Sequence, residues 1–240
     1  MQADQILAAT DQLCQRLKKL RVGEPVTHVY NPLEYARAPH EAYLRQYGNS
    51  SKKVLMLGMN PGPWGMAQTG VPFGEIPAVR DWLGIHETVK KPRVENPKRP
   101  IEGFDCTRSE VSGRRLWGLF AERFESADAF FQDHFVLNYC PLVFMAETGR
   151  NITPDKLSAK ETAAIQQACD EYLAVCFSVL APEWLIGVGA YAETALKRVA
   201  ETAGYSAKLG RVLHPSPASP AANRGWSEAA TKQLEALGVW

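Results

Sequence analysis

KVLMLGM (53–59), followed by NPGPWGMAQTGVPFGE (60–75), is the stretch that decides the fold. It is a short apolar run bounded by polar residues and a Gly/Pro-rich loop, a pattern typical of a buried parallel strand. Three later runs match it: HFVLNY near 134–139, WLIGVG at 184–189 and AKLGRVLH near 207–214. Helical patterns lie between these runs, so we predict an α/β fold with a parallel sheet covered on both faces.

The helices are predicted from apolar spacing and from the residues at their ends. Ser158 and Glu161 form the pattern of a capping box at the start of the helix predicted over 158–180. Three further helices are predicted over 4–20, over 112–124 with Ser112 as the N-cap, and over YAETALKRVAETAG (191–204), which ends at a stop glycine. In THVYNPLEYA (27–36), Pro32 disfavours a helix and predicts an ordered turn that presents Tyr30 and Tyr35.

Length and composition are those of a soluble globular protein. The 240 residues are 45% hydrophobic and 22% charged, enough for one substantial core. We expect one domain over 1–240, with an N-terminal helix at 3–20 packed on it. No stretch approaches a membrane span, and the N-terminus lacks the residue order of a secretion signal. We therefore expect a cytoplasmic protein, or a nuclear one in a eukaryote, with no membrane partner and no obligatory protein partner.

The five cysteines are scattered along the chain and include no C-x-x-C pair. Such spacing favours free structural thiols over a zinc or iron–sulfur site. The loop at 58–75 also lacks the sequence of a nucleoside-triphosphate cradle. We therefore expect no metal and no cofactor.

The charge of the chain is unevenly distributed. A net charge of +1 argues weakly against nucleic acid binding when it is taken alone. However, residues 116–196 contain four basic and eleven acidic residues, so this block is near −7 and the remainder near +8. Part of the excess lies in the Lys/Arg-rich segment 88–100, opposed only by Glu95 at its centre. This segment fits binding of an anionic polymer, and it fits a solvated loop equally well.

Polar residues follow three of the predicted strands directly. Asn60 follows the first strand, Asn138 ends the second, and His214 follows the last. Ligands of parallel α/β sheets bind beyond the carboxyl ends of the strands. We therefore expect these three side chains to meet at one edge of the sheet.

The loop GMNPGPWGMAQTGVPFGE (58–75) contains five glycines and three prolines. Such a loop can hold a rigid, irregular shape against a flat ligand. We therefore favour a functional role for this loop over that of a simple structural turn. Asn60 can hold a water molecule without being titratable. Phe73 either stacks on a heterocyclic ring or belongs to the core.

Asn138 interrupts an apolar strand in FVLNYCPLVFM (135–145). A buried amide is costly unless its hydrogen bonds are made, so either the backbone satisfies it or it faces a pocket. In a pocket, the amide could pair with the edge of a nucleic-acid base.

The segment HPSPASPAANRGW (214–226) combines His214 with three prolines and small residues. A neutral imidazole N–H could hydrogen-bond a developing oxyanion there. Ser216 and Ser219 could donate to a phosphate backbone, and Arg224 could enter a duplex in place of an extruded base. The alternative is a solvent-exposed turn followed by a helix cap.

Together, GMNPGPWGMAQTGVPFGE, NYCPLVFM and HPSPASPAANRGW resemble the single-strand-selective monofunctional uracil-DNA glycosylases, a branch of the uracil-DNA glycosylase superfamily. THVYNPLEYA, SGRRLW and NITPDKL resemble family segments in the same order, so the similarity covers roughly 25–230. It implies a three-layer α/β/α sandwich around a short parallel four-stranded sheet. The implied activity is removal of uracil and oxidised derivatives such as 5-hydroxymethyluracil from single- and double-stranded DNA by base flipping.

The resemblance also implies roles for individual residues. Asn60 would position the attacking water and His214 would stabilise the uracil leaving group. The base would be bound by Met59, Gly62, Phe73 and Asn138, and the DNA by Ser216, Pro217, Ser219, Asn223 and Arg224. Two positions depart from the pattern: Trp64 stands where the aromatic residue varies, and Ala218–Ser219 replaces a bulkier polar pair of vertebrate members. The second difference bears on how deeply the wedge enters DNA and not on the chemistry.

Two other functions were weighed against this one. A non-catalytic reader of damaged DNA could use the same loops, although the presence of both Asn60 and His214 favours catalysis. A hydrolase of free nucleosides would act on uridine or deoxyuridine, whereas a wedge and a basic flank predict no such activity.

Overall fold

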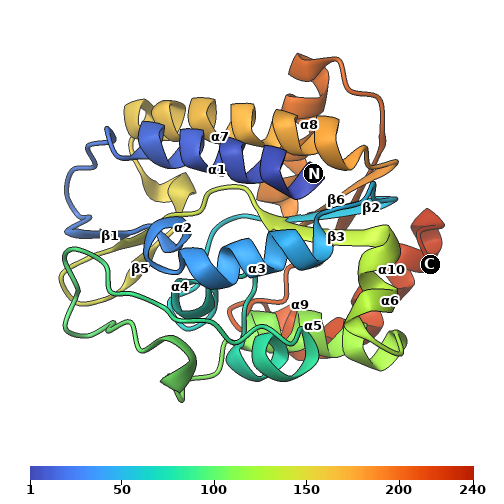
Figure 1. The fold of residues 1–240 in the computed structure, drawn as a ribbon, viewed down its shortest axis with the longest axis horizontal. Coiled ribbons are helices and arrows are strands. Elements are labelled where there is room, and N and C mark those ends of the chain that lie inside the picture. Colours follow the sequence, from blue (N-terminus) through green and yellow to red (C-terminus); the bar gives the residue numbers. More distant parts are fainter.

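The computed structural model describes all residues from 1 to 240 and contains two sheets (Figure 1). A parallel sheet has the order β3-β2-β6-β7, with strands β2 (Val54–Gly58), β3 (His134–Asn138), β6 (Trp184–Val188) and β7 (Lys208–Val212). A small antiparallel sheet has the order β1-β4-β5, with strands β1 (His28–Tyr30), β4 (Val143–Met145) and β5 (Asn151–Ile152). The four predicted strands of the parallel sheet are confirmed.

Ten α-helices accompany these strands. They are α1 (Gln2–Leu17), α2 (Pro32–Tyr35), α3 (Arg37–Tyr47), α4 (Met66–Thr69), α5 (Val111–Arg123), α6 (Ala127–Asp133), α7 (Ala159–Leu180), α8 (Ala190–Ala203), α9 (Pro220–Asn223) and α10 (Trp226–Leu237). Three short turns of other helical types are η1 (Ala78–Trp82), η2 (Gly103–Asp105) and η3 (Pro154–Lys156). None of the helices combines the length and the apolar character that crossing a membrane requires.

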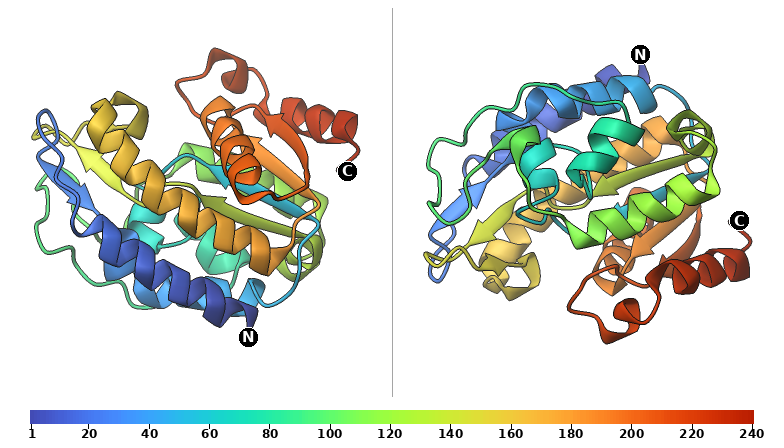
Figure 2. Two further views of the ribbon diagram at one scale, coloured as in Figure 1. Left: turned by 90° about the horizontal axis from the view of Figure 1, so that it is seen from above. Right: turned by 90° about the horizontal axis from the view of Figure 1, so that it is seen from below.

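The helices form layers on both sides of the parallel sheet (Figure 2). Helices α7 and α8 cover one face, with α1 packed outside against α7, and α5 and α10 lie on the other face. Helix α3 packs at the β3 edge, where the Tyr43 hydroxyl donates a hydrogen bond of 2.8 Å to the carbonyl of Val136. This arrangement confirms the α/β/α sandwich.

Strand β2 lies between β3 and β6, and all five of its residues are buried. Because both faces of the sheet are covered by helices, the strand is apolar throughout instead of alternating. Its side chains belong to a hydrophobic core of 59 residues that extends from α1 to α10. This burial fixes the register of the strand and therefore the position of the loop that follows it.

Most of the predicted helix ends are confirmed. The capping box at the start of α7 is present, with the Ser158 side chain accepting from the backbone N–H of Glu161, and α8 ends at Gly204 in the left-handed conformation. The first helix covers Gln2–Leu17, so its predicted last turn is missing.

Two sequence predictions are wrong at helix starts. Pro32 begins α2, with the Asn31 side chain accepting from the N–H of Leu33 at 3.2 Å, because a first helical position needs no N–H. Tyr30 and Tyr35 are buried and are not presented at the surface. Ser112 is not the N-cap of α5, because the helix starts one residue earlier and Glu110 occupies that position.

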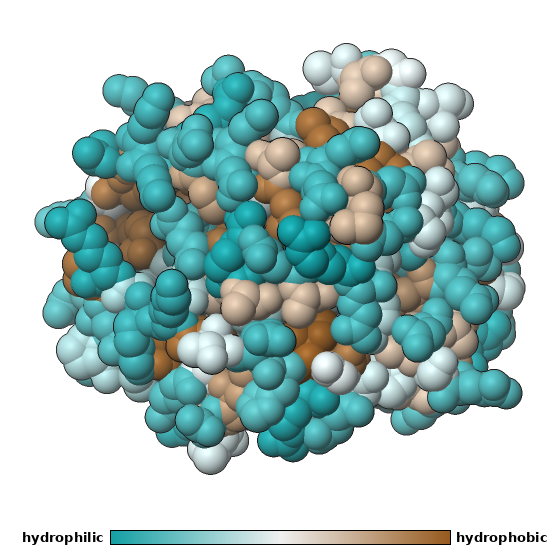
Figure 3. All heavy atoms as spheres, in the orientation of Figure 1, coloured by the Kyte–Doolittle hydropathy of each residue, from teal (hydrophilic) through white to brown (hydrophobic).

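The surface is largely polar. On the face shown in Figure 3, hydrophilic residues dominate and apolar areas are smaller. The large hydrophobic side chains that are exposed are few: Met1, Val29, Val94, Val175 and Leu209. They are scattered along the sequence, and none is among the predicted site residues.

Candidate active site

A cavity of about 360 Å³ opens where the parallel strands end. This volume lies within the range of small-molecule sites. The residues that line it include Met59, Asn60, Gly62, Phe73, Asn138, His214, Ser216 and Pro217. All of the residues that we predicted for catalysis and base binding therefore meet in one place, whereas Ser219, Asn223 and Arg224 lie outside the cavity wall.

Gly58, the last residue of β2, packs against two residues of the cavity wall. A Cβ atom at this position would lie 2.3 Å from Oδ1 of Asn138 and 2.6 Å from the ring of Phe73. Such separations are far below van der Waals contact. The absence of a side chain at Gly58 thus allows the amide and the ring to approach the end of the strand together.

Phe73 adopts a left-handed backbone conformation with φ of 53°. This conformation is strained for a bulky residue and persists only where the surroundings enforce it. The carbonyl of Phe73 accepts from the N–H of Glu75 at 2.7 Å, and it packs so closely on Gly113 that a Cβ there would lie 2.0 Å away. The ring is 9% exposed, so it belongs to the core and also lines the cavity.

The Asn138 side chain is 8% exposed and has no backbone hydrogen-bond partner. Its Nδ2 donates only to the sulfur of Met66, at 3.2 Å. A buried amide needs further partners, and sulfur is a weak acceptor. Of the two alternatives that the sequence left open, this geometry favours an amide that pairs with a ligand.

The tautomer of His214 is set by its own loop. The backbone N–H of Ser216 donates to Nδ1 of His214 at 3.1 Å. Nδ1 is therefore the unprotonated nitrogen of a neutral ring, and Nε2 carries the proton. Because no protein group accepts from Nε2, this N–H is free for a ligand in the cavity.

Burial keeps the His214 ring neutral. It lowers the pKa of the imidazole below 6.5, because the cation loses water without gaining an anionic partner. The ring packs on Gly189, where an added Cβ would lie 3.1 Å from Cβ of His214. Its centroid lies 6.3 Å from that of Phe73, so the two rings belong to the same cavity.

Asn60 lies near the start of the Gly/Pro-rich loop 58–75 and is half-buried. Its Nδ2 makes long hydrogen bonds to the carbonyls of Leu142 at 3.3 Å and Pro61 at 3.4 Å. No protein donor reaches its Oδ1. The amide is therefore oriented by the chain and retains an acceptor that can hold a water molecule.

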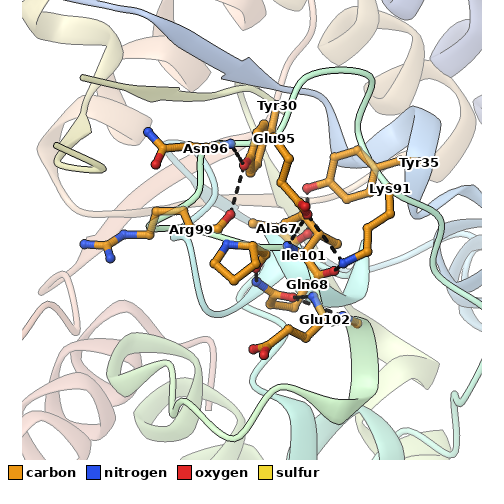
Figure 4. A network of polar contacts seen from close by, with 12 residues as sticks. Tyr30, Tyr35, Ala67, Gln68, Lys91, Glu95, Asn96, Arg99, Ile101 and Glu102 are labelled. Carbon is orange, nitrogen blue, oxygen red and sulfur yellow. Dashed lines mark hydrogen bonds and ion pairs between the residues drawn. The ribbon is translucent and has the colours of Figure 1, made fainter. Parts of the chain in front are cut away.

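Gln68 holds the loop in place and is fully buried. Its Nε2 donates to the carbonyls of Pro63 at 3.1 Å and Pro100 at 3.0 Å, while its Oε1 accepts from the N–H groups of Glu102 at 2.8 Å and Gly103 at 3.1 Å (Figure 4). Every hydrogen-bonding position of the amide is used. Gln68 therefore joins the 60–65 loop to the segment around 100–103 and is not available to a ligand.

Two buried tyrosines support the same region (Figure 4). The Tyr35 hydroxyl donates to the carbonyl of Ala67 at 2.6 Å, and the Tyr30 hydroxyl donates to the carbonyl of Arg99 at 2.9 Å. The N–H of Asn96 in turn donates to the Tyr30 hydroxyl at 2.7 Å. These bonds give THVYNPLEYA a structural role that local sequence chemistry could not reveal.

Glu110 is a residue of the cavity wall that the sequence analysis missed. A Cβ at Gly62 would lie 2.3 Å from its Oε2, and a Cβ at Gly65 would lie 2.7 Å from its Cγ. Burial raises the pKa of this carboxyl, partly opposed by the backbone N–H groups of Ser112 and Trp64. Its position just before SGRRLW was the only available signal.

The segment after His214 is held in shape by α5. Arg115 donates to the carbonyl of Pro215 and to Oδ1 of Asn223, both at 2.9 Å. Asn223 also donates to the carbonyl of Pro217 at 2.8 Å, and the Ser219 hydroxyl accepts from Ala222 at the start of α9. The side chains of Ser219 and Asn223 are therefore engaged within the segment, while Ser216 and Pro217 line the cavity.

Arg224 differs from its neighbours because it is exposed and its side chain forms no hydrogen bond or ion pair within the chain. It lies between α9 and α10, outside the cavity wall. A free guanidinium at this position remains available to a ligand that extends beyond the cavity.

The remaining candidate chemistry is limited. The five cysteines are buried free thiols, as predicted. No three side chains from His, Cys, Asp and Glu are grouped closely enough to hold a metal ion, and no lysine lines the cavity. The cavity therefore presents amides, a neutral imidazole, hydroxyl groups, the Glu110 carboxyl and an aromatic face.

Comparison with known proteins agrees with this geometry. The model of the Uracil DNA glycosylase superfamily matches residues 45–237. The single-strand selective monofunctional uracil DNA glycosylase of Bos taurus is 46% identical over 228 residues, covering 95% of this chain and 84% of the relative. That of Rattus norvegicus is also 46% identical, covering 95% of this chain and 82% of the relative.

A solved structure shares the fold at low sequence identity. The crystal structure of Pedobacter heparinus SMUG2 superposes with a TM-score of 0.67 and is 18% identical, covering 96% of this chain and 97% of that one. At this identity, the likeness concerns the fold alone.

The packing around Gly58 gives a first prediction. Gly58→Ala should lower the free energy of unfolding by about 1–3 kcal/mol, because the added methyl group overpacks the Phe73 ring and the Asn138 amide. Urea denaturation measures the change. Gly118→Ala in α5 is the matched control, since its Cβ would have no atom within 4 Å and it should be neutral or stabilising. A Gly58→Ala protein as stable as the parent would contradict the close packing.

Proposed function

Because this chain belongs to the uracil DNA glycosylase superfamily, we propose that it is a monofunctional glycosylase that removes uracil and oxidised uracils from single- and double-stranded DNA. The enzyme class follows from the family: the chain is a uracil-DNA glycosylase, a hydrolase of N-glycosyl bonds. The finer proposal is supported chiefly by the neutral His214, whose Nε2–H is free in the same cavity as Asn60. Excision of the base would begin base-excision repair.

The proposed reaction needs water, an acceptor for it and a donor to the leaving group. A water molecule held by Oδ1 of Asn60 attacks C1′ of the sugar, and the electron pair of the N-glycosyl bond leaves with the base. The water oxygen forms the new bond to C1′ and its proton is released to solvent or to the departing uracil. Nε2–H of His214 donates to uracil O2, where negative charge develops. One preorganised donor of this kind contributes about 2.7–4 kcal/mol.

A neutral imidazole suits this task. Burial lowers its pKa, which favours the neutral ring, and a neutral imidazole donates a hydrogen bond without being an acid. A lysine amine that could form a covalent imine with the sugar is missing from the cavity wall, which supports a monofunctional enzyme without lyase activity.

We assign recognition of the base to Asn138 and Phe73. The Asn138 amide would donate to uracil O4 and accept from N3–H, and Phe73 would stack on the ring. Met59 and Gly62 would contribute backbone groups to the same cavity. The support for these roles is the close packing of both side chains on Gly58 together with their place in the cavity wall, which brings the amide and the ring within reach of one flat ligand.

The DNA strand would lie along the 215–224 segment. Ser216 and Pro217 reach the cavity and would contact the phosphates next to the extruded nucleotide. Ser219 and Asn223 would act indirectly, since their side chains shape the segment. Arg224 would enter the duplex in place of the extruded base.

A panel of oligonucleotides, each with one modified base, tests the substrate range. We expect abasic-site formation with uracil and 5-hydroxymethyluracil, in single and double strands, unchanged by a chelator. Free deoxyuridine should not be cleaved, which would separate this enzyme from a nucleoside hydrolase. Release of uracil from deoxyuridine, or loss of activity with chelator, would refute the corresponding part of the proposal.

The two catalytic assignments can be tested separately. Asn60→Ala and His214→Leu should each reduce single-turnover uracil excision by at least about a hundredfold, because each removes one preorganised contact to the transition state. Circular dichroism checks that the variants fold. Undiminished excision by either folded variant would remove that residue from the mechanism.

The wedge assignment predicts a difference between substrates. Arg224→Ala should slow excision from double-stranded DNA more than from single-stranded DNA, because only the duplex has a stack to open. The ratio of the two single-turnover rates is the measurement. Arg21→Ala, which removes another exposed arginine without a carboxylate partner, should leave the ratio unchanged. Equal losses on both substrates would exclude a wedge.

A further inference from the structure

Trp64 lies at the rim of the cavity, directly after Pro63 in the cavity wall, and is half-buried. Two guanidinium groups face its ring. Cζ of Arg99 lies 5.0 Å and Cζ of Arg108 lies 5.7 Å from the ring centroid. Both distances are within the range of cation–π attraction.

The cluster is assembled by contacts already described for the loop. Gln68 joins Pro63 to Pro100, and so places Arg99 beside the Trp64 segment. The backbone of Arg99 is fixed through its carbonyl by the Tyr30 hydroxyl, while its guanidinium extends away from this network (Figure 4). The position of the cation is therefore built into the fold.

Neither arginine is neutralised by an acidic partner. Arg99 and Arg108 take part in none of the fourteen ion pairs of the chain. Arg99 makes one side-chain hydrogen bond, from Nη1 to the carbonyl of Lys98 at 2.8 Å, and its buried Nε has no partner. The acidic residues nearest in sequence are Glu102 for Arg99 and Glu110 for Arg108, and neither forms an ion pair with these arginines. Two guanidinium groups thus lie close together at the rim, and both keep N–H donors that no protein group uses.

A third arginine lies in the turn between this cluster and the cavity wall. The turn at Gly149 packs on Arg99, since a Cβ there would lie 3.2 Å from Cγ of Arg99. This turn precedes Asn151, which lines the cavity, and carries Arg150, which also forms no ion pair. The basic rim is therefore continuous with the wall of the site.

We propose that Trp64, Arg99 and Arg108 form a platform that binds the DNA strand flanking the extruded nucleotide, the two guanidiniums on phosphates and the indole edge against sugar or base. A planar guanidinium held on an aromatic ring loses little freedom when it binds a phosphate and donates in a fixed geometry. Aromatic rings beside cationic grooves are the recurrent means of holding single strands without reading their sequence. The inference rests on the proposed action on DNA.

The platform differs from the wedge in what it predicts. A contact to the strand that carries the target base is made whether or not a complementary strand is present. Its loss should therefore weaken binding of single- and double-stranded substrates alike, whereas loss of the Arg224 wedge affects the duplex selectively.

Binding is measured by fluorescence anisotropy with a single-stranded oligonucleotide that contains a tetrahydrofuran abasic analogue. The double variant Arg99→Gln/Arg108→Gln should bind roughly tenfold more weakly. The slope of log K against log salt is negative, and its magnitude should decrease by about 1.4, since each phosphate contact on a single strand contributes about 0.7. The single-turnover excision rate at saturating enzyme should stay within about twofold of the parent, because the cavity is untouched. Trp64→Leu should also weaken binding of this oligonucleotide.

The control is Arg123→Gln. Arg123 lies 4.4 Å over the ring of Trp240 and also forms no ion pair, but it stands at the far end of α5 from the cavity. It should change neither affinity nor salt slope. Parental affinity and slope in the Arg99/Arg108 variant would overturn the platform, and so would a loss that appears only in the saturated excision rate. An inactive parent protein would instead refute the proposed function, so the two failures are distinguishable.

Discussion

The missing side chain of Gly58 is the constraint on which the site depends. Strand β2 must be apolar and buried on both faces to hold the centre of the sheet, yet its last residue must leave space for the amide of Asn138 and the ring of Phe73. Glycine satisfies both requirements at this one position, because it continues the strand and adds no side chain. The core and the cavity are thus parts of one packed structure, and a change in one is transmitted to the other.

The strain at Phe73 follows from the same closeness. A left-handed conformation costs of order 1–3 kcal/mol in a bulky residue, and the surrounding contacts must offset it. Gly113 packs on its carbonyl, and Gln68 fixes the loop that leads to it. Much of the Gly/Pro-rich loop therefore serves to hold one aromatic ring in an orientation that an unstrained backbone would not give.

The sequence predicted the framework well because burial of a central sheet leaves a strong local pattern. Continuous apolar runs located the four parallel strands, and the rule that ligands bind beyond their carboxyl ends located Asn60, Asn138 and His214. The wrong predictions concern residue types that occur in two kinds of local structure. Pro32 predicts the end of a helix, although proline is also common at the first position of one. Ser112 predicts an N-cap, although it is buried inside α5. Glu110 has only a weak local signal, its position just before SGRRLW, because its contact with Gly62 joins distant segments.

The distribution of charge separates catalysis from binding. The groups that we propose act on the base, Asn60, Asn138 and His214, carry no charge when the imidazole is neutral, and burial favours that state. A cation in the cavity would attract any phosphate as strongly as a departing uracil anion, whereas an oriented neutral donor favours the atom on which charge develops. Arg99 and Arg108, which have no acidic partner, lie outside the cavity wall, where we propose that phosphates bind. An overall charge of +1 does not exclude DNA as the substrate, because the proposed phosphate contacts use a few arginines without acidic partners and not the net charge of the chain.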